Sequence, residues 1–433
     1  MDANAAVILA FVIFAVLLLA GAEIAVALLI SGVAGFFLYR GDPGFTPLIP
    51  YGTLNSFILT AIPLFILMGE ILGRCGASDM IYSSASKWLA WAPGGLLHSN
   101  IAACAMFASI SGSSPATAAT VGTVAIPRMK ERRYDTQLLL GSVAAGGTLG
   151  ILIPPSITMI IYGAISQTSI GALFAGGLIP GIMLSIMFMI YIGIRAMMNP
   201  RLAPREKPPS RRELAFSLIS MWPLLFMAVV VLGGIFGGFL TPTEAAAVGS
   251  VAAMVIGLML RRLNWRVFRE SVVEAVKTSC MVLFILMGAF VFAGFLADTR
   301  VPSAISIYVA SLGWSKIPIL AAIYFLYIFL GCFIDPGSIM VITLPAILPI
   351  LNGFGIDLIW FGVVAVVLSE IGMITPPMGL NLFVVQGVSG EDLGKVVIGI
   401  TPFFFILLLG VAILTAFPII ALWFPSLVGL AAG

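Results

Sequence analysis

The sequence predicts an all-α polytopic membrane protein built from two inverted-topology repeats, each with a re-entrant hairpin and a discontinuous helix. Three observations predict this fold: a highly apolar composition, basic residues confined to a few loops, and rare residue types that recur at one offset. Of the 433 residues, 61% are hydrophobic and 9% are charged, against about 25% charged residues in soluble domains. So few charges cannot cover a water-exposed surface, which excludes a soluble enzyme, a disordered protein and a secreted disulfide scaffold.

Long apolar segments predict the membrane spans. Only helices and closed barrels satisfy their backbone in lipid, and these segments lack the alternating pattern of barrel strands. Two further apolar regions, 94–127 and 318–350, are interrupted near their middles. Because a crossing helix needs about 20 apolar residues, spans are predicted at 4–20, 22–39, 57–73, 136–166, 172–196, 214–236, 244–260, 271–296 and 396–424.

Basic residues assign the two sides of the membrane. They gather in three clusters, at 128–133, 195–212 and 261–269, which the positive-inside rule places in the cytoplasm. All but three of the 21 Lys and Arg residues then lie on the inner side, and both termini are predicted to be periplasmic. The polar, proline-rich segment 200–212 is predicted to be a cytoplasmic linker between the two halves.

The two halves, 1–199 and 213–433, are predicted to be inverted copies. A shift of about 222 residues aligns rare residue types, including the proline pairs at 154–155 and 376–377. Counting the crossings places equivalent positions on opposite faces of the membrane. An inverted repeat of this kind is typical of secondary transporters, whose binding site lies near the midplane.

Each half contains a predicted broken helix, at 136–166 and 357–387, with the proline pair inside it. Paired prolines remove backbone donors and interrupt the helical ladder. The freed carbonyls are hard oxygen ligands suited to a small cation, and they are tolerated at membrane depth only where protein or a cavity surrounds them. The half-helix after each break presents N–H groups and a positive dipole end, suited to a carboxylate. The alternative is a proline kink that binds nothing.

The interrupted apolar regions predict re-entrant hairpins over 94–127 and 318–350. The first contains the run SISGSSPAT, whose flanks are too short for two full crossings, and its tip is predicted at 112–114. The offset of 222 places the second tip at 335–337, reached from the opposite side. Two tips beside two breaks predict a dual cation site. The alternative for the serine-rich run is close helix packing, which small residues also permit.

Acidic residues at membrane depth are functional candidates by default. Asp335 is the best of them because it lies at a predicted tip. Glu23 and Glu244 begin equivalent helices and are interpreted as stabilising helix N-termini. Glu70 and Glu370 are left open between an internal ion pair, a bound cation and a proton. No arginine is expected at the site, so a fixed side-chain clamp for the solute is not predicted.

Six runs of the chain follow one another in the order of a known family. They are IPLFILMGEIL (62–72), SGSSPATAATVGTVAIPRM (111–129), GTLGILIPPSI (147–157), TPTEAAAVG (241–249), DPGSIMVITLPAILPI (335–350) and ITPPMGLNLFVV (374–385). Together they resemble the large membrane subunit (M-type, DctM-like) of tripartite ATP-independent periplasmic (TRAP) transporters over nearly the whole chain. The resemblance implies an elevator-type transporter of the bacterial inner membrane, with sodium ions and an organic acid bound between hairpin tips and breaks.

The resemblance also implies partners and site residues. In that family a periplasmic substrate-binding protein delivers the solute, and a small four-helix membrane subunit, here expected as a separate chain, packs against the large one in the lipid bilayer. No cofactor beyond the coupling ion Na⁺, no nucleic-acid partner and no enzymatic activity are expected. The residues predicted to bind Na⁺ and solute are Ser111, Gly112, Ser113, Ser114, Thr117, Gly150, Pro154, Pro155 and Ser156 in the first repeat, and Asp335, Pro336, Gly337, Gly372, Thr375, Pro376, Pro377 and Asn381 in the second.

The sequence therefore predicts Na⁺-coupled uptake of a small carboxylate, such as a C4-dicarboxylate or sialic acid. The chain contains no GxxxxGK[ST] P-loop, so an ion gradient must supply the energy. The main alternative is a stand-alone sodium/anion symporter that needs no binding protein. A channel and an intramembrane enzyme are also considered; the enzyme fits poorly because the chain has one histidine and no HExxH or GxSxG run.

Overall fold

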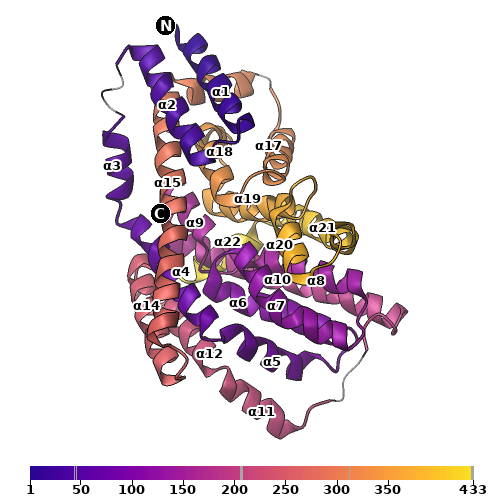
Figure 1. Cartoon of the computed structure of the whole chain (residues 1–433). Coiled ribbons are helices and arrows are strands. Elements are labelled where there is room, and N and C mark those ends of the chain that lie inside the picture. The colour runs from indigo at the N-terminus through magenta and orange to yellow at the C-terminus, as the bar shows by residue number, and fades with distance from the viewer. Residues whose placement is uncertain (43, 45, 205–207, 312, 431–433) are drawn as a thin grey trace.

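The computed structural model describes residues 1–433 except 43, 45, 205–207, 312 and 431–433, so Arg205 and Lys207 of the predicted linker lie outside the described residues. The described residues form helices and no strands (Figure 1). Five helices are long and apolar enough to cross a membrane, or seven if two bent pairs are each one span. The predicted fold class of an all-α polytopic membrane protein is therefore confirmed for the described part of the chain.

The first half contains ten α-helices, of which one pair, Leu48–Leu54 with Ile58–Arg74, is bent by 57°. In order, the elements are α1 (Ala3–Leu19), α2 (Ile24–Arg40), α3 (Leu48–Leu54), η1 (Ile58–Thr60), α4 (Ala61–Arg74), α5 (Ala77–Leu89), α6 (Leu96–Ser111), α7 (Ser114–Glu131), α8 (Thr136–Gly147), η2 (Thr148–Ile151), α9 (Ile157–Ser166) and α10 (Ile170–Met198).

The second half follows with a similar succession, ending in a short helix after a proline. Its elements are α11 (Arg211–Ser220), α12 (Trp222–Ala228), the π-helical turn η3 (Val229–Gly233), α13 (Gly234–Phe236), α14 (Pro242–Met259), α15 (Trp265–Asp298), α16 (Val301–Ser311), α17 (Lys316–Gly331), α18 (Pro336–Gly353), α19 (Leu358–Met373), α20 (Leu380–Ser389), α21 (Leu393–Ala416) and α22 (Ile419–Leu427).

Polar caps begin equivalent helices in the two halves. The carboxylates of Asp135 and Asp357 each accept a hydrogen bond of 2.9 Å from the backbone at the starts of α8 and α19, which are 222 positions apart. The Ser113 side chain caps α7 in the same way that the Asp335 side chain caps α18. A cap satisfies N–H groups that a new helix leaves unpaired. Some of the rare residues that align in the sequence therefore start helices.

Three predicted spans differ from the observed helices. The span 214–236 is bent by 52° at Met221, because Pro223 begins a new helix, α12. The span 396–424 stops at Ala416, since Phe417 precedes a proline and leaves the helical region. The span 271–296 is part of a longer helix, α15. No helix was predicted at α5 or α16, which occupy equivalent places in the two halves.

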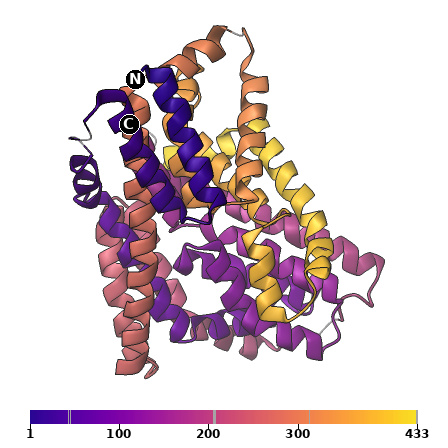
Figure 2. The ribbon, with the colours of Figure 1, turned by 45° about the horizontal axis from the view of Figure 1, so that its top comes forward.

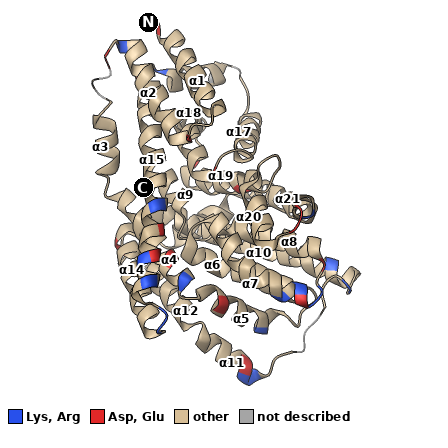
Figure 3. Cartoon of the chain, in the orientation of Figure 1, with Lys and Arg blue, Asp and Glu red and all other residues tan. Residues whose placement is uncertain are grey.

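The helices form two groups. One group packs against α15, and the other packs around the hairpins. In Figures 1 and 2, α15 lies beside α2 and α4, and α18 of the second hairpin, α17–α18, also packs against it, whereas the first hairpin, α6–α7, lies farther from α15. Close packing depends on glycine: a Cβ on Gly32 of α2 would lie 2.8 Å from the backbone nitrogen of Phe292 in α15. The basic clusters at the ends of α7, α11 and α14 lie in the lower half of Figure 3.

Candidate functional site

Both hairpin tips line one cavity of about 620 Å³, together with residues that flank the two helix breaks, Ile151 and Ile157 at the first and Met373 and Leu380 at the second. Its wall contains 111–116 from the first tip and 335–337 from the second, which lie more than 200 positions apart in the chain. Parts of α4 and α15 close the remaining sides. The other residues of the wall are Ile66, Gly69, Glu70, Gly73, Arg74, Phe107, Thr120, Ile151, Ile157, Thr158, Ile161, Thr278, Met281, Val282, Met373 and Leu380.

The first tip turns at a glycine and contacts the first break. Gly112 has a left-handed φ of +59°, and a Cβ there would lie 2.9 Å from the carbonyl oxygen of Pro155. A larger residue would therefore be strained and would also displace the break. The hydroxyls of Ser111 and Thr117 lie 2.7 Å apart across the tip. Thr117 also donates to the carbonyl oxygen of Ser113.

Gly150, just before the first break, also allows the first hairpin tip to approach the break closely. A Cβ on Gly150 would lie 2.6 Å from the Ser113 carbonyl oxygen and 2.7 Å from the Thr117 hydroxyl. After the break, the Ser156 hydroxyl accepts a hydrogen bond of 3.3 Å from the backbone of Met159 and begins α9. The first hairpin tip and the first break thus form one packed unit.

The second tip begins with a carboxylate. Asp335 accepts a 3.0 Å hydrogen bond from the backbone nitrogen of Ser338 and a 2.5 Å hydrogen bond from its hydroxyl. Each carboxylate oxygen has a further lone pair, so capping α18 does not exhaust its binding capacity. Asp335 also lines a second cavity of about 950 Å³, together with Glu23.

The second break is closed by its own backbone and by the second hairpin. The Thr375 hydroxyl donates to the carbonyl oxygen of Ile371 at 2.6 Å, and the backbone nitrogen of Gly379 donates to that of Cys332 at 3.3 Å. A Cβ on Gly372 would lie 2.4 Å from the Cα of Gly331 in α17. As in the first half, a glycine allows the hairpin to approach the broken helix.

A fully enclosed carboxylate, Glu370, lies between the halves. The Ser114 hydroxyl is 2.8 Å from Glu370 Oε2 and 2.6 Å from the carbonyl oxygen of Gly147, and its single hydrogen serves only one of them. The Asn381 amide donates to the same hydroxyl at 3.2 Å. Glu370 is 1% exposed and Asn381 0%. Within the described part of the chain, Glu370 Oε1 and Asn381 Oδ1 have no hydrogen-bond partner.

Comparison with known proteins decides the family. Residues 11–420 match the model of the DctM component of tripartite ATP-independent periplasmic transporters. The chain belongs to this TRAP transporter family. The C4-dicarboxylate TRAP transporter large permease protein DctM of Pseudomonas aeruginosa is 38% identical to it over 381 residues, which are 88% of this chain and 89% of that protein.

Other TRAP permeases are nearly as similar. The sialic acid TRAP transporter large permease protein SiaM of Vibrio cholerae is 33% identical over 419 residues, 95% of this chain and 96% of that protein. These relatives are named as transporter components, which confirms the expectation of transport and not catalysis. The fold is also similar to the crystal structure of the Alcanivorax borkumensis YdaH transporter, with a TM-score of 0.61 and 15% identity over 86% of this chain and 87% of that one.

The predicted site residues of this TRAP large subunit divide into two groups. Those that line the cavity are Ser111, Gly112, Ser113, Ser114, Asp335, Pro336 and Gly337. Those that lie outside its wall are Thr117, Gly150, Pro154, Pro155, Ser156, Gly372, Thr375, Pro376, Pro377 and Asn381. In the second group, the side chains of Pro376 and Pro377 are exposed.

Two charged residues at or near the cavity were not assigned a role from the sequence. Glu370 was undecided between three roles, although an acid inside the apolar run before the second proline pair is a usable signal. Arg74, the last residue of α4, lines the cavity, although no arginine clamp was expected from the sequence. Arg74 follows an apolar span and has the pattern of a helix-end charge, so its sequence position does not reveal that α4 faces the hairpin tips.

Proposed function

We propose that this DctM-family subunit couples the inward movement of Na⁺ to the uptake of a small organic acid. The observation that carries the proposal is the pair of enclosed oxygens without partners, Glu370 Oε1 and Asn381 Oδ1, beside Ser114 at the base of the first tip. An enclosed carboxylate is costly unless a cation or a proton compensates it. Unpaired oxygens in an apolar interior therefore favour a bound positive charge.

The surrounding groups favour a metal cation of the sodium type over a proton. A proton needs one oxygen, whereas a small hard cation takes several oxygen ligands at once. Carboxylate, amide, hydroxyl and backbone carbonyl oxygens come here from α19, α20, α7 and α8. The Gly147 carbonyl belongs to the last turn of α8, just before the first break, where backbone oxygens become available for ligation.

The cavity supports the proposal of an anionic solute. The N-termini of α7 and α18, each 18 residues long, begin in its wall, and helix N-termini present N–H groups and a positive dipole end. The relatives are named for C4-dicarboxylates and for sialic acid, so the solute varies within the family. We therefore propose the class of organic acids and no single compound.

The remaining parts of the proposal follow the family. The chain is proposed to lie in the bacterial inner membrane with both termini in the periplasm. A separate small membrane subunit would pack against it, and a periplasmic binding protein would deliver the solute. An elevator-type movement would carry the two hairpins and broken helices relative to α15 and its neighbours. Each positive charge carried inward in excess of the negative charge on the solute contributes about 2.3 kcal/mol to uptake per 100 mV of membrane potential.

Reconstitution into proteoliposomes tests this function. The purified subunit with its small partner is expected to accumulate radiolabelled succinate or N-acetylneuraminate only when a Na⁺ gradient and the matching binding protein are both present. Choline in place of Na⁺ is the matched control for ionic strength. Uptake without Na⁺ contradicts the coupling, and equal uptake without the binding protein identifies a stand-alone symporter.

A further inference from the structure

An arginine shares the cavity with both hairpin tips. Arg74 is the last residue of α4, and within the described residues it is the only lysine or arginine in the cavity wall. Much of the rest of the wall is apolar or carries serine hydroxyls. The first tip is close to α4, because a Cβ on Gly69 would lie 3.0 Å from the carbonyl oxygen of Ile110.

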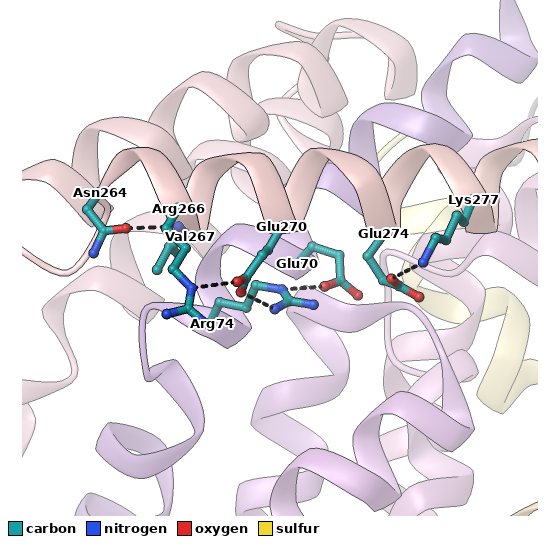
Figure 4. A network of polar contacts seen from close by, with 8 residues as sticks. All are labelled: Glu70, Arg74, Asn264, Arg266, Val267, Glu270, Glu274 and Lys277. Carbon is teal, nitrogen blue, oxygen red and sulfur yellow. Dashed lines mark hydrogen bonds and ion pairs between the residues drawn. The ribbon is translucent and has the colours of Figure 1, made fainter.

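Two carboxylates hold this guanidinium group, as Figure 4 shows. Arg74 Nε donates to Glu70 at 3.1 Å, and its Nη1 donates to Glu270 of α15 at 3.2 Å. Glu270 also accepts a hydrogen bond of 2.9 Å from Arg266. Glu270 therefore keeps a positive partner if Arg74 changes its contacts. Glu70 also lines the cavity, beside Arg74.

Both contacts of Arg74 have the geometry of exchangeable ion pairs. They are single hydrogen bonds and are longer than the roughly 2.7–2.9 Å of strong charge-assisted bonds. The side chains of Arg74 and Glu70 are 35% and 30% exposed, so another carboxylate can reach them from the cavity. A guanidinium group offers five N–H donors in a planar fork that matches a carboxylate with two parallel hydrogen bonds.

We propose that Arg74 binds a carboxylate of the transported solute by exchanging it for Glu70. This inference rests on the proposed uptake of organic acids and names the residue that selects them. In the absence of solute, Glu70 and Glu270 compensate the charge of Arg74. When a solute carboxylate enters the cavity, it takes the place of Glu70 at the fork, while Glu270 remains paired with Arg266. A neutral amide analogue cannot make this exchange.

Solute binding to the purified full chain, with the small subunit that co-purifies, tests the inference. Thermal unfolding is followed during titration with succinate, N-acetylneuraminate and the neutral analogue succinamide, because a ligand that binds the native state stabilises it. In Arg74→Gln the dissociation constant of the carboxylate that binds the wild type is expected to rise about ten- to a hundredfold, the cost of losing hydrogen bonds to a charged group. Arg74→Lys keeps the charge without the fork and is expected to be intermediate.

Two control variants separate this role from general charge effects. Lys277→Gln removes a basic residue of α15 that pairs with Glu274 and does not line the cavity, and it is expected to bind the solute like the wild type. Glu70→Gln removes the competing carboxylate and is expected to bind the solute at least as tightly. Unchanged carboxylate affinity in Arg74→Gln overturns the inference. If Arg74→Gln does not unfold cooperatively, its affinity cannot be measured, and Arg74→Lys decides. An Arg74→Lys chain that binds the carboxylate as tightly as the wild type overturns the inference.

The same samples separate this failure from failure of the proposed function. Stabilisation by Na⁺ alone, measured without carboxylate, depends on the Glu370 site and is expected to persist in Arg74→Gln. If carboxylates stabilise the wild type and Arg74→Gln equally, organic-acid uptake stands and the role of Arg74 is overturned. If neither carboxylate stabilises the wild type, both proposals are overturned.

Discussion

At the scale of single residues, Glu370 is the side chain on which the proposed ion coupling depends. Its carboxylate is enclosed, one oxygen contacts Ser114 of the first tip, and the other has no partner among the described residues. Because Ser114 also contacts Asn381, one hydroxyl joins the first hairpin to the helices on both sides of the second break. A cation bound here would therefore tie together the parts that form the cavity.

Glu370→Gln is expected to abolish Na⁺-dependent stabilisation and to raise the Na⁺ concentration for half-maximal uptake at least about tenfold. The amide has nearly the same shape but removes the charge that a cation compensates, so the chain is expected to fold without Na⁺. Thermal unfolding and uptake across a Na⁺ titration measure both effects. Ser369→Ala is the matched control, since its hydroxyl is bonded within its own helix to Ala365. An unchanged Na⁺ response in Glu370→Gln contradicts the proposed site.

Some of these residues were predicted from the sequence, and others were not. Ser113 and Asp335 were found because N-caps are rare polar residues inside apolar regions, and their offset links them. The contact between Ser114 and Glu370 spans 256 positions, and periodicity along one helix does not report such a pairing. Arg74 was not among the predicted site residues, because its position facing the tips depends on how α4 packs against α6.

At the scale of elements, hairpins and breaks were predictable where their ends were marked by caps, glycines and prolines. The spans at 214–236 and 396–424 were predicted as continuous helices although each is interrupted, because hydropathy does not distinguish a continuous helix from two helices that meet at a proline. α5 and α16 were missed because the composition of a short connecting helix resembles that of a loop. Whether a segment forms one continuous helix, two helices or a short connecting helix depends more on packing than on local sequence.

One polar contact links two elements outside the spans. Lys130, near the end of α7, lies 2.7 Å from Glu391 in the loop before α21, and Lys395 lies 2.8 Å from the same carboxylate. These two lysines lower the pKa of Glu391 to about 2. Since the pKa is lower in the folded state, the contact stabilises the fold above the ordinary carboxylate pKa of about 4.3 and loses this effect as the pH falls toward 2.

Glu391→Gln is therefore expected to lower the melting temperature by no more than about 2 °C near neutral pH, as for an exposed ion pair. The difference from the wild type should narrow as the pH falls from about 5 to about 3, because Glu391 then gains a proton in the unfolded wild type but keeps its charge in the folded one. Differential scanning fluorimetry across this range measures it. A deficit that stays constant down to pH 3 contradicts the assignment of the charge to Glu391.

At the scale of the whole molecule, the proposed function requires two half-chains that converge on one cavity from opposite sides of the membrane. Helices α7 and α18 begin 222 positions apart, as do α8 and α19, and both hairpin tips line the same cavity. The offset was readable because capping and breaking residues are rare in apolar sequence. The convergence of the two tips on one cavity could not be predicted from the sequence, because it depends on packing between helices that are distant in the chain.

Labelling of single cysteines tests this central claim most directly. Glu131 and Asn352 are exposed residues at the far ends of α7 and α18. Each is replaced by cysteine, Glu131→Cys or Asn352→Cys, in a chain whose exposed Cys280 is changed to serine. A membrane-impermeant maleimide applied to intact cells is expected to label the Asn352→Cys chain, and to label the Glu131→Cys chain only after permeabilisation. Labelling of both positions from the same side contradicts the inverted arrangement and the shared site that depends on it.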